Sequence, residues 1–434
     1  MKYAVVTFGC RVNQADSLGF EEALIAAGAV AAAPQDADLV VVNSCSVTAT
    51  ADQGARQTIR RISRDNPHAR IVVTGCYATR RPEDVAALPN VERVVLNDDK
   101  PRLIQLLRRP EGTAEGAKIA EKTLGSAFLA VSAVSSGSDG ACGAVVEPGV
   151  AGRTAFTLRV QTGCAEPCSY CIIPTTRGMP RSVPPDDVLR EVARVRAAGF
   201  KEIALTGVHL GSYGRDLRPA CSLIDLLRTL DFSNILFRIS SLEPMDCSRE
   251  VVDLVASSDR FAPHFHLPLQ HASNRVLSAM RRPYTIDYYA SLVDDIRARI
   301  PTASIGSDLI VGFPGETEDD FEQLVDYLER SPLTHVHVFP YSDRPGTPAS
   351  AMTDKVNGVV VRERGRRIRA IGQRLIQRFR DSLVGTTHRA LTLEDGTLAV
   401  TGNYVKVRIP PGRARNEWVR VRLTSQDDGE LLSG

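Results

Sequence analysis

The first 110 residues alternate between short runs of β-branched residues and stretches with helical spacing, and this alternation restricts the fold more than any other feature. Continuous apolar runs indicate strands that are buried on both faces, as in a parallel sheet covered by helices. We therefore expect an α/β domain built on an open parallel sheet. The four expected strands are Ala4–Thr7, Leu39–Asn43, Ile71–Thr74 and Val91–Leu96.

A cysteine follows each of the first three strands, at Cys10, Cys45 and Cys76. In an open parallel sheet, ligands bind beyond the carboxyl ends of the strands, so three loops would bring three thiols to one point. Three thiolates fit an iron–sulfur cluster that keeps one iron open to another ligand. The alternative is three buried structural cysteines, because free cysteine is often part of a core.

The length of the chain requires more than one domain, because 434 residues exceed what one hydrophobic core usually holds. Residues 125–152 are rich in Gly, Ser and Ala and carry almost no charge, which predicts a linker. We accordingly expect an N-terminal domain at 1–124, a central domain at 153–377 and a C-terminal domain at 378–434.

The central domain contains six strand–helix cycles, which predict a partial (β/α)6 barrel with its site on the loops after the strands. A helix is expected at 318–330, where Thr317 and Asp320 form a capping-box pattern. The expected strands are Phe156–Gln161, Glu202–Thr206, Ile235–Ser240, His264–Leu269, Ser304–Val311 and Val336–Tyr341.

The C-terminal residues read as short alternating strands around a hairpin turn at Asp395–Gly396, which predicts a small β-barrel. In "YVKVRI" and "WVRVRL" the valines would face the barrel core. The basic side chains between them would face outward and could contact RNA phosphates, or they could form an ordinary solvated face. These basic residues are Lys406, Arg408, Arg420 and Arg422.

A second set of thiols, Cys164, Cys168 and Cys171, has C-x3-C-x2-C spacing and follows the first strand of the central domain. Three thiolates at this spacing can hold three corners of a 4Fe–4S cluster, and no fourth cysteine follows locally. A zinc site would need paired ligands such as C-x2-C twice, and that pattern is missing. We expect Cys142, Cys221 and Cys247, which fit neither set, to be inert.

The overall composition is that of a globular protein with a net charge of only +2, which excludes a strongly basic body. No apolar run approaches the roughly 20 residues that span a bilayer. The N-terminus lacks the cleavage site of a signal peptide. We therefore expect a cytoplasmic protein without a membrane segment, in a compartment where thiols stay reduced.

The C-x3-C-x2-C loop resembles that of the radical S-adenosylmethionine (SAM) enzymes. In that family the open iron binds SAM, and the reduced cluster cleaves it to a 5′-deoxyadenosyl radical. The segments "SSLEP" and "GSDLIVGFPGE" also resemble regions that contact SAM in the family. The resemblance implies SAM contacts at strand ends, at Gly207, Ser240, Glu243 and Gly312.

The two cysteine sets together resemble one family over nearly the whole chain, the radical SAM methylthiotransferases. The tail resembles the TRAM domain of that family, an RNA-binding β-barrel. The resemblance implies two 4Fe–4S clusters, an auxiliary one on the N-terminal cysteines and a radical one on the central loop. The matching segments are "GCRVNQADS", "NSCSV", "TGCYATR", "CSYCIIPTTRG", "LPLQHASNRVLSAMRR" and "IVGFPGETEDDF".

The family offers three substrates: threonylcarbamoyladenosine or isopentenyladenosine in tRNA, and an aspartate of a ribosomal protein. The segments "LTGVHLGSYG" and "RISSLEPMD" resemble the threonylcarbamoyl branch, whereas "LQHAS" resembles the ribosomal-protein branch. We expect methylthiolation at C2 of threonylcarbamoyladenosine next to the anticodon, at position 37, with His209, Arg177 and Arg181 as polar partners of the substrate. An RNA-binding iron–sulfur protein without catalysis is the alternative from another class. The sequence identifies neither the electron donor nor the sulfur source.

Overall fold

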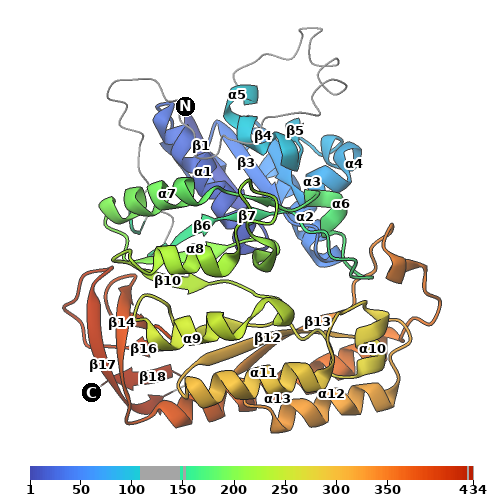
Figure 1. The fold of residues 1–434 in the computed structure, drawn as a ribbon. Helices are drawn as coiled ribbons and strands as arrows, with labels where there is room; N and C mark the ends of the chain where they lie inside the picture. Colours follow the sequence, from blue (N-terminus) through green and yellow to red (C-terminus); the bar gives the residue numbers. More distant parts are fainter. Residues whose placement is uncertain (108–146, 150–152, 428–429, 434) are drawn as a thin grey trace. The chain divides into compact units, whose positions relative to one another are not determined.

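The computed structural model describes residues 1–107, 147–149, 153–427 and 430–433 (Figure 1). Cys142 and most of the expected linker lie outside the described residues. The chain divides into two compact units. Within the described residues, the first unit contains residues 1–107 together with Thr175–Gly178, and the second contains the others.

The first unit is built on a five-stranded parallel sheet with the order β2-β1-β3-β4-β5, which confirms the expected open parallel sheet. The additional strand, β2, was not expected; it has only two residues, and both are exposed. The strands are β1 (Lys2–Thr7), β2 (Val30–Ala31), β3 (Leu39–Ser44), β4 (Arg70–Gly75) and β5 (Val91–Val95).

Helices cover both faces of this sheet, which explains its continuous apolar strands. Alternate residues of β3 belong to different cores: Val40 and Val42 pack with α2, whereas Val41 packs with Phe20 and Leu24 of α1. The helices are α1 (Arg11–Ala26), α2 (Ala49–Asp65), α3 (Cys76–Arg80), α4 (Pro82–Ala86) and α5 (Leu103–Leu107), with 3-10 turns at η1 (Pro34–Asp36) and η2 (Asn97–Arg102).

The second unit contains the partial barrel as two three-stranded parallel sheets, with the orders β10-β9-β6 and β11-β12-β13. All six expected strands are present. They are β6 (Phe156–Arg159), β9 (Glu202–Thr206), β10 (Leu236–Ile239), β11 (His264–His266), β12 (Ser304–Val311) and β13 (His335–Pro340). A short antiparallel pair, β7 (Gln161–Thr162) and β8 (Arg181–Ser182), follows β6.

The helices of the barrel pack on one face of these strands, and α12 has the expected bounds, Glu318–Arg330. The Thr317 hydroxyl accepts from the backbone N–H of Asp320, whose carboxylate accepts in return, so the capping box is formed. The other helices are α6 (Ile173–Arg177), α7 (Pro185–Ala197), α8 (Leu223–Leu230), α9 (Arg249–Ser257), α10 (Asn274–Ala279), α11 (Ile286–Arg299) and α13 (Gly358–Leu383), with 3-10 turns at η5 (Leu210–Ser212), η6 (Pro244–Asp246) and η7 (Pro348–Ala351).

The longest helix, α13, crosses the expected domain boundary at 377/378 and continues to Leu383. Its buried Ile368, Ile371 and Leu375 recur at helical spacing, so the periodicity continues past the point where the composition changes. Within the part of the chain that the structure describes, no helix combines the length and apolar character needed to cross a membrane.

The C-terminal strands close into a five-stranded barrel with the order β14-β15-β16-β18-β17, as expected (Figure 1). Gly396 has a φ of +83° in the turn between the first two strands, a conformation that glycine adopts without strain. The core contains Ala390, Val407 and Leu423. The strands are β14 (Thr387–Leu393), β15 (Leu398–Thr401), β16 (Lys406–Arg408), β17 (Trp418–Asp427) and β18 (Glu430–Ser433).

Candidate functional site

In the first unit the three cysteines follow three adjacent strand ends. Cys10 precedes α1, Cys45 follows β3, and Cys76 begins α3 directly after β4. A Cβ atom on Gly9 would lie 2.5 Å from Cys45 Sγ, so glycine is needed for the first two loops to approach each other. The φ of Gly9 is +87°, which also favours glycine.

Buried charges surround these thiols. The Arg177 guanidinium and the Lys100 ammonium both lie next to Cys76, and their side chains are 2% and 4% exposed. Lys100 donates to the Asp16 carboxylate at 2.7 Å, while Arg177 donates to Asn13 at 2.5 Å. Two cations therefore share one carboxylate, which leaves positive charge for an anionic group at the cysteines.

The pKa values of the Cys45 and Cys76 thiols shift in opposite directions. Burial raises the pKa of the Cys45 thiol to about 11, and the neighbouring Cys10 and Cys76 add to the shift. Burial also acts on Cys76, but Arg177 and Lys100 outweigh it and lower the pKa of that thiol. Three converging thiols with buried cations beside them fit an iron–sulfur cluster, whose sulfur ligands are thiolates.

In the second unit, Cys164, Cys168 and Cys171 lie on the loop between β7 and α6. Each sulfur accepts a hydrogen bond. Backbone N–H groups of Glu166 and Ile173 donate to Cys164 and Cys171 at 3.4 and 3.5 Å. The Arg282 guanidinium donates to Cys168 Sγ at 3.2 Å. Burial raises the pKa of the Cys171 thiol to about 12, and the hydrogen bond from Ile173 opposes that effect. Because donors reach all three sulfurs and would stabilise bound thiolates, this loop also fits a cluster.

Arg282 connects the cysteine loop to Glu243, one of the expected SAM contacts. Its guanidinium forms an ion pair with the Glu243 carboxylate and donates to the Tyr284 hydroxyl at 3.0 Å. Burial raises the pKa of the Cys168 thiol, and Arg282 opposes that effect. Arg282 was not among the predicted site residues, although it lies inside the "LPLQHASNRVLSAMRR" segment that carries the family resemblance.

The other three expected SAM contacts also lie at strand ends of the barrel. Ser240 follows β10, and its buried hydroxyl oxygen has no hydrogen-bond partner among the described residues. Such an orphaned oxygen fits a polar ligand that is not present here. Gly312 has a φ of +77° directly after β12, and Gly207 follows β9 in close contact with Leu210. The residues present thus fit SAM, and the individual contacts stay predictions.

Two of the three expected substrate partners are buried in the structure, and their contact with the substrate stays a prediction. Arg177 is buried against the N-terminal cysteines of the first unit. His209 Nε2 lies 2.7 Å from Asp246, and the imidazole also bonds to Cys164. Burial lowers the pKa of His209, but these two hydrogen bonds outweigh it and raise the pKa to about 9. Both side chains have buried partners that the sequence could not reveal, whereas Arg181 lies on β8, paired with Thr162.

The four basic residues expected at an RNA surface are all exposed on the C-terminal barrel. Lys406 and Arg408 lie on β16, whereas Arg420 and Arg422 lie on β17, and these two strands are separated by β18. The charges therefore form two patches. On the β17 side, the Arg389 guanidinium lies 3.8 Å from the centroid of the Trp418 ring. RNA binding by either patch stays a prediction.

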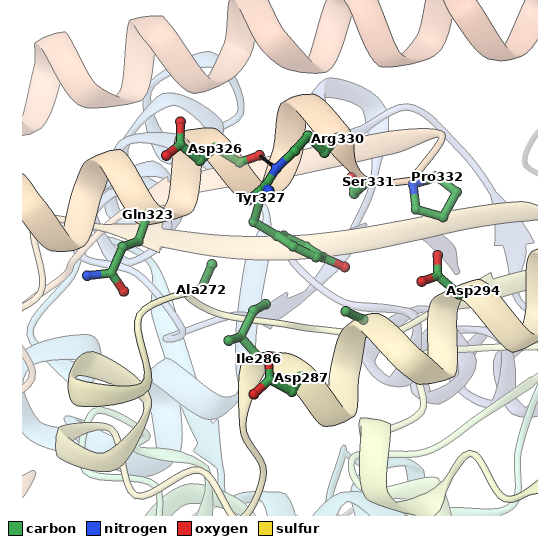
Figure 2. A pocket seen from close by; sticks show the side chains of 11 residues that line it. Ala272, Ile286, Asp287, Asp294, Gln323, Asp326, Tyr327, Arg330, Ser331 and Pro332 are labelled. Carbon is green, nitrogen blue, oxygen red and sulfur yellow. Dashed lines mark hydrogen bonds between the residues drawn. The ribbon is translucent and has the colours of Figure 1, made fainter.

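A hollow of about 440 Å³ lies between α11 and α12, on the helical layer of the second unit (Figure 2). Tyr327 projects into it, with Asp287, Asp294 and Asp326 around the rim. Its lining contains no cysteine and none of the strand-end residues described above. Within the second unit, the cysteine loop and the strand ends are therefore better candidates for a functional site than this hollow.

Of the cysteines outside the two sets, Cys247 is buried and Cys221 is partly exposed, and neither forms a disulfide. Burial raises the pKa of the Cys247 thiol to about 12, so it stays a neutral thiol. The expected inertness of Cys247 is consistent with this burial.

Two family models match the chain. The model of Uncharacterized protein family UPF0004 matches residues 2–97, and that of the Radical SAM superfamily matches residues 158–328. Each matched region contains one set of three cysteines. The chain is 37% identical over 431 residues to the Threonylcarbamoyladenosine tRNA methylthiotransferase MtaB of Aquifex aeolicus, covering 98% of this chain and 100% of that relative. The chain belongs to the radical SAM methylthiotransferase family.

Other members of the family have a similar sequence identity to this chain. The MtaB protein of Bacillus subtilis is 35% identical, with 86% of this chain and 80% of that relative covered. A Carboxydothermus hydrogenoformans relative named tRNA-2-methylthio-N(6)-dimethylallyladenosine synthase is 34% identical, with 82% and 79% covered. The family uses SAM and 4Fe–4S clusters, and the role of the six cysteines as cluster ligands stays a prediction.

Among solved structures, the radical SAM methyltransferase TsrM of Kitasatospora setae shares the fold. The TM-score is 0.54 at 18% identity, and the match covers 80% of this chain and 75% of that chain. At this identity the likeness concerns only the fold. It agrees with the α/β architecture that the sequence predicts.

Proposed function

We propose that this enzyme is a transferase that adds a methylthio group to C2 of N6-threonylcarbamoyladenosine at position 37 of tRNA. The observation that carries the proposal is the full-length similarity to relatives named for this activity, at 37%, 35% and 31% identity. It coincides with two separate groups of three cysteines at strand ends. Relatives named for dimethylallyladenosine reach 34% identity, so that nucleoside is the second candidate.

The reaction replaces an unactivated C–H bond by C–S–CH3, and such a hydrogen is beyond the reach of side-chain bases. Cys164, Cys168 and Cys171 would hold one cluster, which together with SAM would supply the radical chemistry needed to remove this hydrogen. Cys10, Cys45 and Cys76 would hold an auxiliary cluster, which would supply the sulfur. The protein contributes binding, orientation and charge, as is general for cofactor enzymes.

Three charged residues have defined roles in this scheme. Arg282 supports the thiolate of Cys168 and at the same time fixes Glu243, so that cluster and SAM are held by one buried cation. Lys100 and Arg177 balance the charge of the auxiliary cluster, because both lie beside Cys76 with little solvent to screen them.

The partner of the C-terminal barrel is tRNA, and the β14–β17 side is the stronger candidate for contact with it. Exposed Arg420 and Arg422 lie there with Trp418, and a ring beside guanidinium groups can stack on bases while the cations meet phosphates. A tRNA substrate also favours a cytoplasmic location. The electron donor and the sulfur source are further partners whose identity this proposal does not require.

Nucleoside mass spectrometry of tRNA from a deletion strain tests the proposal. We expect loss of 2-methylthio-N6-threonylcarbamoyladenosine and accumulation of its precursor without the methylthio group. Loss of the methylthio-dimethylallyl nucleoside instead would favour the second candidate. Loss of a ribosomal-protein modification would reject tRNA as the substrate.

A further inference from the structure

As far as Asp308 and His337, the inner face of strands β11, β12 and β13 carries polar side chains, whereas the outer face is mostly apolar. Phe265, Ile305 and Leu309 point outward and are at most 3% exposed. Val336 also points outward, since it contacts Gly372 of α13. The alternate residues therefore face the interior of the barrel. They are His264 and His266 on β11, Ser304, Gly306, Asp308 and Ile310 on β12, and His335, His337 and Phe339 on β13.

Three of these side chains meet at one spot. One ring nitrogen each of His266 and His337 and one carboxylate oxygen of Asp308 all lie within 4.8 Å of one another. Asp308 and His337 are register partners on adjacent strands. The His266 and Asp308 side chains are 14% and 28% exposed and His337 is exposed, so a ligand can reach all three.

The cluster is held in place from one side. Ser241 Oγ lies 2.8 Å from His266 Nδ1, and His266 Nε2 lies 3.2 Å from the Asp308 carboxylate. His266 thus orients Asp308 and is itself oriented by Ser241. The other polar atoms of the cluster are available, because among the described residues His337 has ring contacts but no hydrogen bond.

Stacked rings close the barrel below the cluster. The rings of His264 and His335 are 6.0 Å apart, and Tyr404 of the C-terminal barrel lies 5.1 Å from His264. A Cβ atom at Gly306 would overlap the His335 ring, so the floor is closely packed. The cluster is therefore reached from the carboxyl ends of the strands, where Gly312 follows the strand that carries Asp308.

We propose that Asp308 and His337 form the subsite for the threonylcarbamoyl group of the substrate, with His266 as the residue that positions Asp308. This inference rests on the proposed function. His337 donates to the carboxylate of the threonyl moiety, and Asp308 accepts from its hydroxyl. The two groups lie on neighbouring carbons of the ligand, as the two side chains lie on neighbouring strands.

The same arrangement selects against an apolar N6 substituent. A dimethylallyl group would leave Asp308 and His337 without partners in a space from which it excludes water. A site built for polar groups rejects an analogue that lacks them far more strongly than an apolar pocket rejects an added hydroxyl. The cluster therefore provides a physical basis for choosing between the two tRNA substrates.

Two imidazoles and one carboxylate are also a possible ligand set for a divalent transition metal. Metal-bound histidines almost always donate their second ring nitrogen to a fixed partner. His266 has such a partner, whereas His337 has none among the described residues. This difference favours a substrate subsite over a metal site.

The test compares anticodon stem-loops with threonylcarbamoyladenosine, its carboxyl methyl ester, or unmodified adenosine at position 37. The proteins are the cluster-loaded wild type, His337→Ala, Asp308→Asn, and His68→Ala as an exposed control. We measure the Kd by fluorescence anisotropy and the kcat/KM for methylthiolation. Iron content and the visible spectrum verify that each variant is folded and loaded.

We expect wild type and His68→Ala to prefer the carboxylate-bearing stem-loop over the ester by about 10- to 100-fold. His337→Ala should lose most of this preference, because neither the acid nor the ester then receives a hydrogen bond from residue 337. Asp308→Asn should weaken the binding of both modified stem-loops relative to unmodified adenosine.

Each other outcome overturns a different statement. Variants that keep the wild-type preference reject the subsite while leaving the proposed function intact. A wild type that transfers no methylthio group to the threonylcarbamoyl stem-loop rejects the proposed function itself. A stoichiometric metal other than iron, present in wild type and absent from His337→Ala, replaces the substrate subsite by a metal site.

Discussion

The guanidinium carbon of Arg238 lies 4.6 Å from the centroid of the Tyr404 ring. Arg238 comes from β10 of the partial barrel, and Tyr404 comes from the loop between β15 and β16 of the C-terminal barrel. Arg238 also donates to the Glu202 carboxylate and to the Gly402 carbonyl, both at 2.8 Å. One buried arginine thus joins the C-terminal barrel to the strands of the radical SAM barrel.

We expect Arg238→Met to lower the free energy of unfolding by about 3 kcal/mol, because Glu202 would remain buried without its partner. Urea unfolding under anaerobic conditions measures the change. Arg249→Met on α9 is the matched control, since the Arg249 side chain is 77% exposed and its removal should be nearly neutral. Equal effects of the two substitutions would contradict a structural role of the buried pair.

The auxiliary cluster can be tested by iron content. Two 4Fe–4S clusters correspond to about eight irons in a fully reconstituted chain. Changing Cys10, Cys45 and Cys76 together to Ala should remove about half of this iron. An unchanged iron content would show that these three thiols hold no cluster.

The two cysteine sets should have separable roles. Cys168→Ala should abolish reductive cleavage of SAM, because its thiolate is a ligand of the radical cluster. Cys45→Ala should retain substantial cleavage but yield no methylthio product. Chromatography of 5′-deoxyadenosine and of the product nucleoside measures both, with Cys221→Ala as a control that retains both activities. Normal product from Cys45→Ala would contradict a sulfur-delivery role.

The two basic patches of the C-terminal barrel should contribute unequally to tRNA binding. Changing Arg420 and Arg422 to Glu should weaken tRNA binding and reduce its salt dependence. The slope of the logarithm of the binding constant against the logarithm of the salt concentration should fall by about one unit for each phosphate that is no longer neutralised. Reversing Lys406 and Arg408 should have a smaller effect, because the stacked pair of Arg389 and Trp418 lies on the β17 side of the barrel.

A charge-matched control separates local contact from net charge. In the control variant, the exposed Arg61 and Arg64 on α2 of the first unit are both changed to Glu. Filter binding at several salt concentrations gives the slopes. If all three double variants bind tRNA like wild type, the barrel is not the RNA surface.

Stability should fall at mildly acidic pH through the buried His271. Burial lowers its pKa to about 4, and its Nδ1 accepts from the Ser273 N–H at 3.0 Å, which a protonated ring could not do. The unfolded chain takes up a proton near the ordinary pKa of about 6.5, whereas the folded chain does not. The stabilisation is therefore complete above about pH 6.5 and is lost as the pH falls toward 4.

We expect the wild type to lose about 2 kcal/mol more than His271→Asn between about pH 6.5 and 5. Asparagine keeps an acceptor at the same position but does not titrate. His68→Asn, on an exposed loop, should behave like wild type. Parallel pH profiles for wild type and His271→Asn would refute this assignment. Urea unfolding at the two pH values provides the measurement.

The strands and the cysteine positions could be predicted because both depend on local sequence. Continuous apolar runs defined β3 and β4, and the rule that parallel strands end at one edge was enough to group Cys45 with Cys76. The bounds of α12 followed from its capping box and apolar face. In each case, residues that are close together in the sequence were sufficient for the prediction.

The charged partners could not be predicted, because they depend on tertiary approach. Arg177 and His209 were expected as polar partners of the substrate, and their burial beside a cysteine was not foreseen. Arg282 reaches Cys168 from a segment far along the chain. The polar alternation in "HFH" and "HVHVF" was visible in the sequence, but only the register of β12 with β13 brings Asp308 and His337 together.

Arg177 belongs to the first unit although it follows the cysteine loop of the second. During synthesis on the ribosome, the sheet with Cys10, Cys45 and Cys76 emerges first, as N-terminal domains generally do. Its balancing guanidinium is translated only after Cys164, Cys168 and Cys171. The nascent N-terminal unit therefore lacks the positive charge of Arg177 beside Cys76 until the loop with Cys164, Cys168 and Cys171 has been translated.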